Sequence, residues 1–283
     1  MSSDLATASP RAPVLFISHG APTFAIEPGR LGPLLATLGQ QLGDIRAVLV
    51  VSPHWQSRGV KVMATAAPET VYDFGGFPSA LYKLKYPAPG QPAIAAEVQQ
   101  LLSDAGWPTT LDTQRGLDHG AWVPLRHLLP EANLPVFQVS LPHDLDTAGA
   151  LRLGQALAPL RSRGVLVVGS GSMTHNLYEF RHADAAVAEY AVEFTHWVRQ
   201  AVVGNAVDKL VHYRQLAPHA ARSHPTEEHY LPLLVALGAR GTDDSPQVLD
   251  GGVANGVLSM ESYAWGMPNS HSSSTMAQTI GSH

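Results

Sequence analysis

The side chains of this chain that are best suited to chemistry are its histidines. The 283 residues include 14 histidines, no cysteine, and only 18 lysines and arginines together. Imidazole binds first-row metals and exchanges protons near neutral pH. Because thiols are absent, disulfides, thiolate nucleophiles and iron–sulfur clusters are excluded, and a metal site would need nitrogen and oxygen ligands.

Four histidines follow short apolar runs that are typical of buried strands. His19 follows Val14–Ile17, His54 follows Ala47–Val51, His143 follows Val136–Val139, and His175 follows Val165–Val168. In a parallel α/β sheet the carboxyl ends of the strands share one edge, where ligands bind. We therefore expect these imidazoles to converge, although any one of them alone could be an ordinary loop histidine.

Two further histidines lie where helices are predicted to begin. His119, within Gly116–Trp122, occupies a loop-to-helix junction. His229 follows Thr226, a residue type that caps helices, which would put His229 in the first turn. Pro232 would then fall inside that helix and kink or restart it. A first-turn side chain can point back into a site at the sheet edge.

The elements that would position these side chains alternate between strand and helix. Helical spacing of apolar residues occurs near residues 31–42, 94–102, 153–160 and 187–198. The pattern predicts a single α/β domain with a mostly parallel central sheet flanked by helices and the active site at the carboxyl ends of the strands. Gln247–Leu249 and Val257–Ala264 predict late strands, antiparallel at an edge.

The predicted domain covers residues 13–267, because no linker divides the chain. Residues 1–12 and 268–283 are predicted to be flexible tails, and the second contains His271 and His283. Residues 68–89 hold four prolines and no clear periodicity, which favours a long ordered loop near the site. Its aromatic side chains would either wall a pocket or pack in the ordinary way: Tyr72, Phe74, Phe77 and Tyr82.

Composition argues against several partners. The net charge is −5 without a lysine or arginine block, so nucleic acid is not an expected partner. No apolar run approaches the roughly 18 residues of a membrane span, and the first residues do not resemble a signal peptide, so we predict a cytoplasmic protein. Gly169–Ser172 matches neither a phosphate-binding loop nor a nucleophile elbow, which makes a serine hydrolase using Ser170 or Ser172 the weaker alternative.

Five segments, in this order, resemble the DODA-type extradiol aromatic ring-opening dioxygenases, the 4,5-DOPA dioxygenase-like branch of the class III extradiol superfamily. The resemblance runs from about Val14 to Gly266, and its specificity comes from the five segments taken together. The segments are Ser18-His19-Gly20-Ala21-Pro22, Ser52-Pro53-His54-Trp55, Leu117-Asp118-His119-Gly120, Gly169-Ser170-Gly171-Ser172-Met173-Thr174-His175-Asn176-Leu177 and Glu228-His229-Tyr230-Leu231-Pro232-Leu233.

The resemblance implies an Fe(II) centre, with Zn(II) in its place in some members. It implies that His19 and His54 are metal ligands. The third ligand would be His229, or the adjacent Glu228, because related branches use a glutamate. His175 would be a proton-transfer residue or a fourth ligand to zinc.

The same resemblance implies that His119 orients the substrate or dioxygen and shuttles protons, whereas His143 receives no role. The implied substrates are dioxygen and a catechol-type aromatic such as DOPA, whose ring opens beside the two hydroxyls. Arg58, Arg126 or Lys83 could pair with a substrate carboxylate. Two alternatives stay open: a zinc-dependent, non-redox, hydrolase-like enzyme on the same scaffold, and a binding protein with an inactive site.

Overall fold

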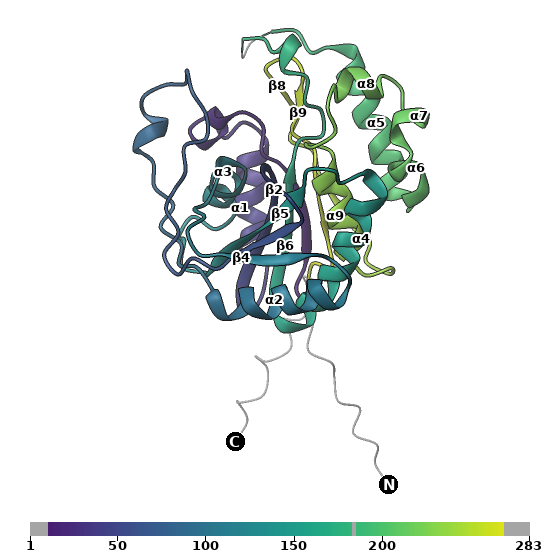
Figure 1. Cartoon of the computed structure of the whole chain (residues 1–283). Coiled ribbons are helices and arrows are strands. Elements are labelled where there is room, and N and C mark those ends of the chain that lie inside the picture. The colour runs from purple at the N-terminus through teal and green to yellow at the C-terminus, as the bar shows by residue number, and fades with distance from the viewer. Residues whose placement is uncertain (1–10, 183–184, 269–283) are drawn as a thin grey trace, which may run out of the picture.

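Four parallel strands form the centre of an eight-stranded sheet in the computed structural model, which describes residues 11–182 and 185–268 (Figure 1). Their spatial order is β5 (Val136–Pro142), β2 (Ala47–Ser57), β6 (Val165–Gly171) and β1 (Val14–Ser18). All four were predicted from their apolar runs, and each extends further toward its carboxyl end. Apart from the last residues of β2, they are buried, as expected for parallel strands covered on both faces.

The outer strands make the sheet mixed. On one side β10 (Ser262–Trp265) runs antiparallel to β1 and pairs with the edge strand β7 (Pro246–Leu249). On the other side β3 (Val60–Met63) is antiparallel to β5 and parallel to the edge strand β4 (Thr109–Asp112). The predicted late antiparallel strands are thus confirmed. However, residues 257–264 divide between β10 and the short β9 (Leu258–Ser259), which pairs with β8 (Val253–Ala254).

Helices cover the two faces of the sheet. In Figure 1, α1 (Leu31–Gly39) and α3 (His119–Leu128) lie on one side of it, and α4 (Thr147–Leu157) and α9 (Leu231–Ala239) lie on the other. A Cβ added at Gly154 of α4 would lie 2.0 Å from the Val235 carbonyl oxygen of α9. Because only glycine permits so close an approach, α9 can lie tightly between α4 and the central strands.

The remaining helices lie around this frame. Helix α2 (Pro92–Asp104) packs near β3 and β4, and α5 (Glu189–Val203) leads into a group of short helices at one end of the molecule (Figure 1). The short helices are α6 (Val207–Val211), α7 (Tyr213–Leu216) and α8 (Ala220–Ser223). Short 3-10 helices span Pro22–Ala25, Leu81–Lys83, Ala158–Arg163 and Leu177–Glu179.

The predicted tails fall mostly outside the described residues. Residues 1–10 and 269–283, with His271 and His283, lie there. Ala12 is buried: its N–H donates to the Arg161 carbonyl, and its own carbonyl accepts from Arg161 Nε at 2.7 Å. Ala12 therefore belongs to the folded part. Among the described helices, none combines the length and apolar character needed to cross a membrane.

Candidate metal centre

Five histidines from distant parts of the chain meet at the carboxyl ends of the central strands. The ring centroids of His19, His54 and His229 lie 5.0 to 5.4 Å apart. The His119 ring lies 3.9 Å from that of His54, and the His175 ring stacks on that of His229 at 3.4 Å. We call these five residues the histidine cluster. They line one side of a cavity of about 480 Å³, within the range of small-molecule sites.

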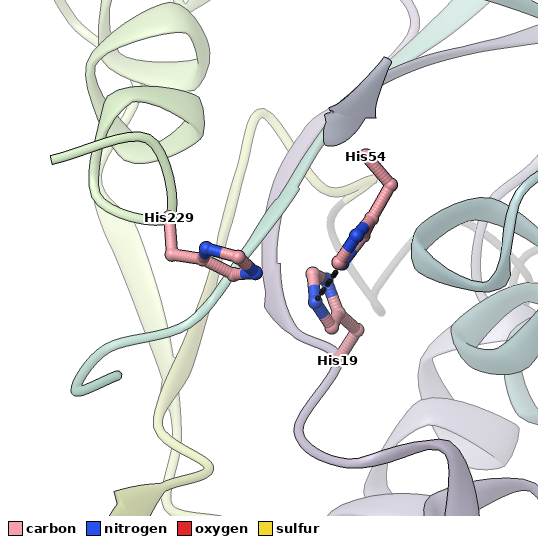
Figure 2. Close-up of side chains that lie close together, drawn as sticks. All are labelled: His19, His54 and His229. Atoms are coloured by element: carbon pink, nitrogen blue, oxygen red, sulfur yellow. Dashed lines mark hydrogen bonds between the residues drawn. The ribbon is translucent and has the colours of Figure 1, made fainter. Parts of the chain in front are cut away.

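Three members of the cluster offer nitrogens to a common point. His19, His54 and His229 each place a ring nitrogen within 4.8 Å of the other two, and Figure 2 shows the three rings facing one another. The Nε2 atoms of His19 and His54 are 3.2 Å apart. The Nε2 atom of His229 is buried and has no hydrogen-bond partner. A buried nitrogen without a partner needs an explanation, and a metal ion held by three imidazoles would supply one.

The tautomer of His19 is fixed by a chain of contacts that starts at a proline. Pro124, inside α3, has no N–H, so the carbonyl of Gly120 four residues earlier lacks its usual helical donor. The Ser170 hydroxyl donates to that carbonyl at 2.5 Å. Its oxygen then accepts from His19 Nδ1 at 3.0 Å, which leaves the Nε2 lone pair of His19 for a metal. Ser170 is therefore used to orient His19, in contrast to the weaker serine hydrolase alternative.

His54 lies in an irregular stretch of β2, where the pairing with β5 shifts register between Val51 and Gln56. Such bulges redirect side chains at the ends of strands. The His54 N–H donates to Ser52 Oγ at 3.2 Å, and Ser52 in turn donates to the buried Asp118 carboxylate at 2.9 Å. Asp118 also accepts from Arg115 at 2.9 Å and is thus a paired buried charge. This network holds the backbone that carries His54.

His229 lies in the turn before α9, because that helix begins at Leu231. The predicted N-cap at Thr226 is therefore wrong: its hydroxyl donates to the Glu228 carboxylate instead. Pro232 falls in the first turn of the helix, where a missing N–H costs nothing, rather than kinking it. Glu228 Oε1 lies 3.2 Å from His229 Nδ1, on the opposite side of the ring from Nε2. That carboxylate can orient the His229 ring in the way that carboxylates orient metal-binding histidines.

Asp73, which the sequence did not single out, controls the start of α3. Its Oδ1 accepts from the His119 backbone N–H at 2.9 Å, and its Oδ2 lies 3.0 Å from His119 Nδ1 and 3.6 Å from His54 Nδ1. Asp118 is the N-cap residue by position, but its side chain is engaged elsewhere, so Asp73 supplies the capping oxygen. The available signal was its place between Tyr72 and Phe74, in the loop predicted to lie near the site.

Burial keeps most of the cluster neutral. It lowers the pKa of His19 and His229 well below the usual value, and the neighbouring imidazoles add to that effect. Burial likewise lowers the pKa of His54 and His175 to about 4. Burial would raise the pKa of Asp73, but hydrogen bonds from His119 outweigh it and lower that pKa to about 2. Neutral imidazoles beside a charged carboxylate are the protonation states that metal binding requires.

His143 is the one strand-end histidine that does not join the cluster. It is exposed, and its N–H donates to the Ser57 carbonyl at 3.0 Å. Because β2 continues past His54 and pairs with the end of β5, His143 is placed beside Ser57, three residues beyond the site. Its lack of a role in the family pattern agrees with this position.

The other side of the cavity is apolar, and we call its five largest side chains the apolar wall: Phe74, Phe77, Leu177, Phe180 and Leu258. The loop at residues 68–89 is therefore confirmed as part of the site. Tyr72 and Tyr82 pack within the loop instead, where Tyr72 donates to the Leu84 carbonyl at 2.5 Å and Tyr82 to the Phe74 carbonyl. The three cations proposed to meet a substrate carboxylate do not line the cavity: Arg58, Arg126 and Lys83.

Comparison with known proteins gives one consistent answer. A family model described as the catalytic LigB subunit of aromatic ring-opening dioxygenase matches residues 32–264. A 4,5-DOPA dioxygenase extradiol of Beta vulgaris is 39% identical, over 88% of this chain and 94% of its own. The protein of the same name from Escherichia coli K12 is 38% identical, over 91% of this chain and 96% of its own.

A solved structure agrees with the sequence comparisons. The crystal structure of an uncharacterized protein from Escherichia coli K12 superposes with a TM-score of 0.76 at 34% identity, and the match covers 90% of this chain and 99% of that one. The family match includes every member of the histidine cluster except His19. The similarity therefore extends over the sheet and the cavity together.

Proposed function

This chain belongs to the family of the catalytic LigB subunit of aromatic ring-opening dioxygenases and is an extradiol ring-cleaving dioxygenase; from this premise we propose that it uses Fe(II) and dioxygen to open the ring of a catechol such as DOPA. The observation that carries the proposal is the convergence of His19, His54 and His229 as neutral imidazoles beside an aromatic-lined cavity. Three such ligands leave positions open for substrates. The absence of cysteine fits the cytoplasm, which we propose as its compartment.

The ligand set that we propose is His19, His54 and His229. Its support is the unpartnered Nε2 of His229 and the Ser170 bond that frees Nε2 of His19. Iron(II), when bound, supplies the activation of both the diol and dioxygen. Glu228 acts in this proposal as the carboxylate that orients His229, not as the third ligand.

The two remaining members of the cluster are proposed to move protons. His175 is neutral at neutral pH and lies against His229, so it can accept the proton that a catechol hydroxyl loses. The Asp73 carboxylate lies 3.0 Å from His119 Nδ1, and His119 lines the cavity, so its ring can orient substrate and return a proton. The apolar wall excludes water from the ring that is to be opened.

A zinc-dependent, non-redox activity is the second candidate, and one observation favours it. The His175 ring lines the same cavity as the proposed three ligands and stacks on the His229 ring at 3.4 Å, so His175 is the candidate for a fourth ligand. Four nitrogen and oxygen ligands suit tetrahedral zinc. The same donor types accept either metal, so the choice is made by experiment.

The deciding experiment compares the two metals in the same protein. Metal-free protein is loaded anaerobically with Fe(II) or with Zn(II) and then given oxygen with DOPA, caffeate or protocatechuate. We expect oxygen uptake equal to substrate loss, with a yellow ring-opened product, only in the iron form. An iron form that takes up no oxygen with any of the three would contradict the proposal.

A further inference from the structure

The loop that carries His175 is held in place by a segment that the proposed reaction does not use. His175 follows β6, and residues 222–224, at the end of α8, are bonded to it. The His175 N–H donates to the Ser223 carbonyl at 2.7 Å, and the Asn176 side chain donates to the Arg222 carbonyl at 2.8 Å. We call residues 222–224 the supporting segment.

His224 makes the third bond between the supporting segment and this loop, and it does so with its side chain. Its Nε2 lies 2.9 Å from the Met173 carbonyl oxygen, two residues before His175. Because a carbonyl oxygen only accepts, Nε2 carries the proton and donates. The side chain of His224 is fully buried, and burial lowers its pKa to about 3, so the ring is neutral and this N–H is the one donor that it has.

The aromatic rings around His224 fix the direction of that N–H. The ring centroids of Phe194, Tyr213 and Tyr230 lie 5.4 to 6.1 Å from that of His224, and all three side chains are buried. Tyr213 and Tyr230 also stack on each other at 3.8 Å. Since a side chain in such close packing keeps one orientation, the donor stays directed at the Met173 carbonyl.

The supporting segment leads on to His229, so its bonds also set how two rings of the histidine cluster meet. The Ser172 N–H donates to the His229 carbonyl at 2.9 Å, and the His175 N–H donates to Ser223, so the two stretches of backbone are joined at both ends. The His175 ring stacks on the His229 ring at 3.4 Å with an interplanar angle of 8°. Such precision matters for proton transfer, because a displacement of about 1 Å can cost about 100-fold in rate.

From these contacts we propose that His224 is a positioning residue: its N–H, acting through the Met173 carbonyl, holds the His175 ring in place for proton transfer. The inference rests on the proposed function, because it concerns the support of that same site. Among the described residues His224 does not line the cavity, so it acts on turnover only through His175. Iron binding should depend on it less, because Glu228 orients His229 separately.

A matched pair of variants isolates the hydrogen bond. His224→Gln keeps an amide N–H that can reach the Met173 carbonyl, whereas His224→Met has a side chain of similar length without a donor. Both lose the ring, so the difference between them reports the bond alone. In the iron-loaded enzyme we expect kcat of His224→Met to be at least about tenfold below that of His224→Gln, with equal KM and iron content. Equal kcat in the two variants, or loss of iron in parallel with kcat, would overturn the inference.

Amide hydrogen exchange over residues 172–176 gives a second readout that needs no turnover. We expect His224→Met to speed exchange there by about fivefold or more, and His224→Gln to stay near the unaltered protein, with or without iron. Phe194→Leu is the packing control, because it changes the surroundings of His224 without removing a hydrogen bond. It should leave both kcat and this exchange unchanged. If it has the same effects as His224→Met, general packing explains them and the inference fails.

The two readouts separate this inference from the proposed function. If the unaltered iron-loaded protein takes up no oxygen, the proposed function fails, and the exchange rates still decide whether His224 holds the loop. Unchanged exchange in His224→Met would overturn that support. His224→Phe, which keeps a ring without the donor, replaces His224→Met if the latter does not fold.

Discussion

The two sides of the cavity are held in place by different means. The histidine cluster sits on the ends of buried strands and on the starts of α3 and α9, and its members are fixed by buried partners such as Ser170 and Asp118. The apolar wall comes largely from irregular segments, and Leu177 and Phe180 are 58% and 41% exposed. Helices and strands position catalytic side chains more accurately than loops do, whereas loops tolerate substitutions better.

This difference predicts different consequences of substitution on the two sides. Changes in the histidine cluster and its partners should alter metal binding and kcat. Changes in the apolar wall should alter KM and the choice of substrate while metal content stays constant. Substitutions on the two sides test that separation, and their expected effects decrease from the metal ligands to the apolar wall.

Replacing the proposed third ligand should have the largest effect. His229→Ala should lower kcat/KM by more than about 100-fold, because it removes a nitrogen ligand of the proposed site itself. Losing a residue that only supports a metal ligand typically costs about 10- to 100-fold. Glu228→Gln should cost less, since that carboxylate only orients the ring. Steady-state oxygen uptake by both variants measures this. A larger loss in Glu228→Gln than in His229→Ala would reverse the ligand assignment.

The partner of His19 comes next. Ser170→Ala removes the acceptor that fixes the His19 tautomer, so metal affinity should fall by about 10- to 100-fold. Ser172→Ala is the matched control, because that hydroxyl is equally buried but donates to the Thr174 carbonyl. Competition with a chelator gives both affinities. If the two variants lose the same amount, the effect is general packing and not the tautomer of His19.

Asp73 should affect turnover more than metal binding. Asp73→Asn keeps an oxygen for the His119 N–H but removes the charge beside His119 Nδ1, so kcat should fall by about tenfold while KM and metal content change little. Glu69→Gln alters an exposed carboxylate of the same loop and should have no effect. Parallel loss of metal and of kcat in Asp73→Asn would mean that Asp73 mainly supports His54.

The smallest effect is expected in the apolar wall. Phe77→Leu removes aromatic contact from the cavity, which should raise KM by about fivefold, or about 1 kcal/mol, the lower end of the range for small changes in apolar pockets. Metal content and kcat should stay at the level of the unaltered enzyme. A variant with normal KM but reduced metal would show that the wall and the histidine cluster are not separable.

The sequence predicts the histidine cluster better than the apolar wall, for a physical reason. Buried parallel strands have a strong apolar signal, and their geometry brings His19, His54 and His175 to one edge. The same rule wrongly included His143, because the extension of β2 beyond His54 depends on an irregular register that no local pattern shows.

Features that depend on tertiary contacts could not be predicted. Asp73 acts on His119, 46 residues away, and the bond from Ser170 to the Gly120 carbonyl requires Pro124 in a helix packed over another strand. The N-cap expected at Thr226 suits local propensity, but its hydroxyl bonds to the Glu228 carboxylate while the helix begins at Leu231. Local propensity is a weak guide where such contacts compete with it.

The proposed metal centre is tested most directly by the iron content of three proteins after equilibrium dialysis against Fe(II) under anaerobic conditions. We expect one iron per chain in the unaltered protein and in His175→Ala, and less than about a tenth of that in His19→Ala, with circular dichroism showing that all three are folded. Full iron occupancy in folded His19→Ala would contradict a metal centre built from His19, His54 and His229.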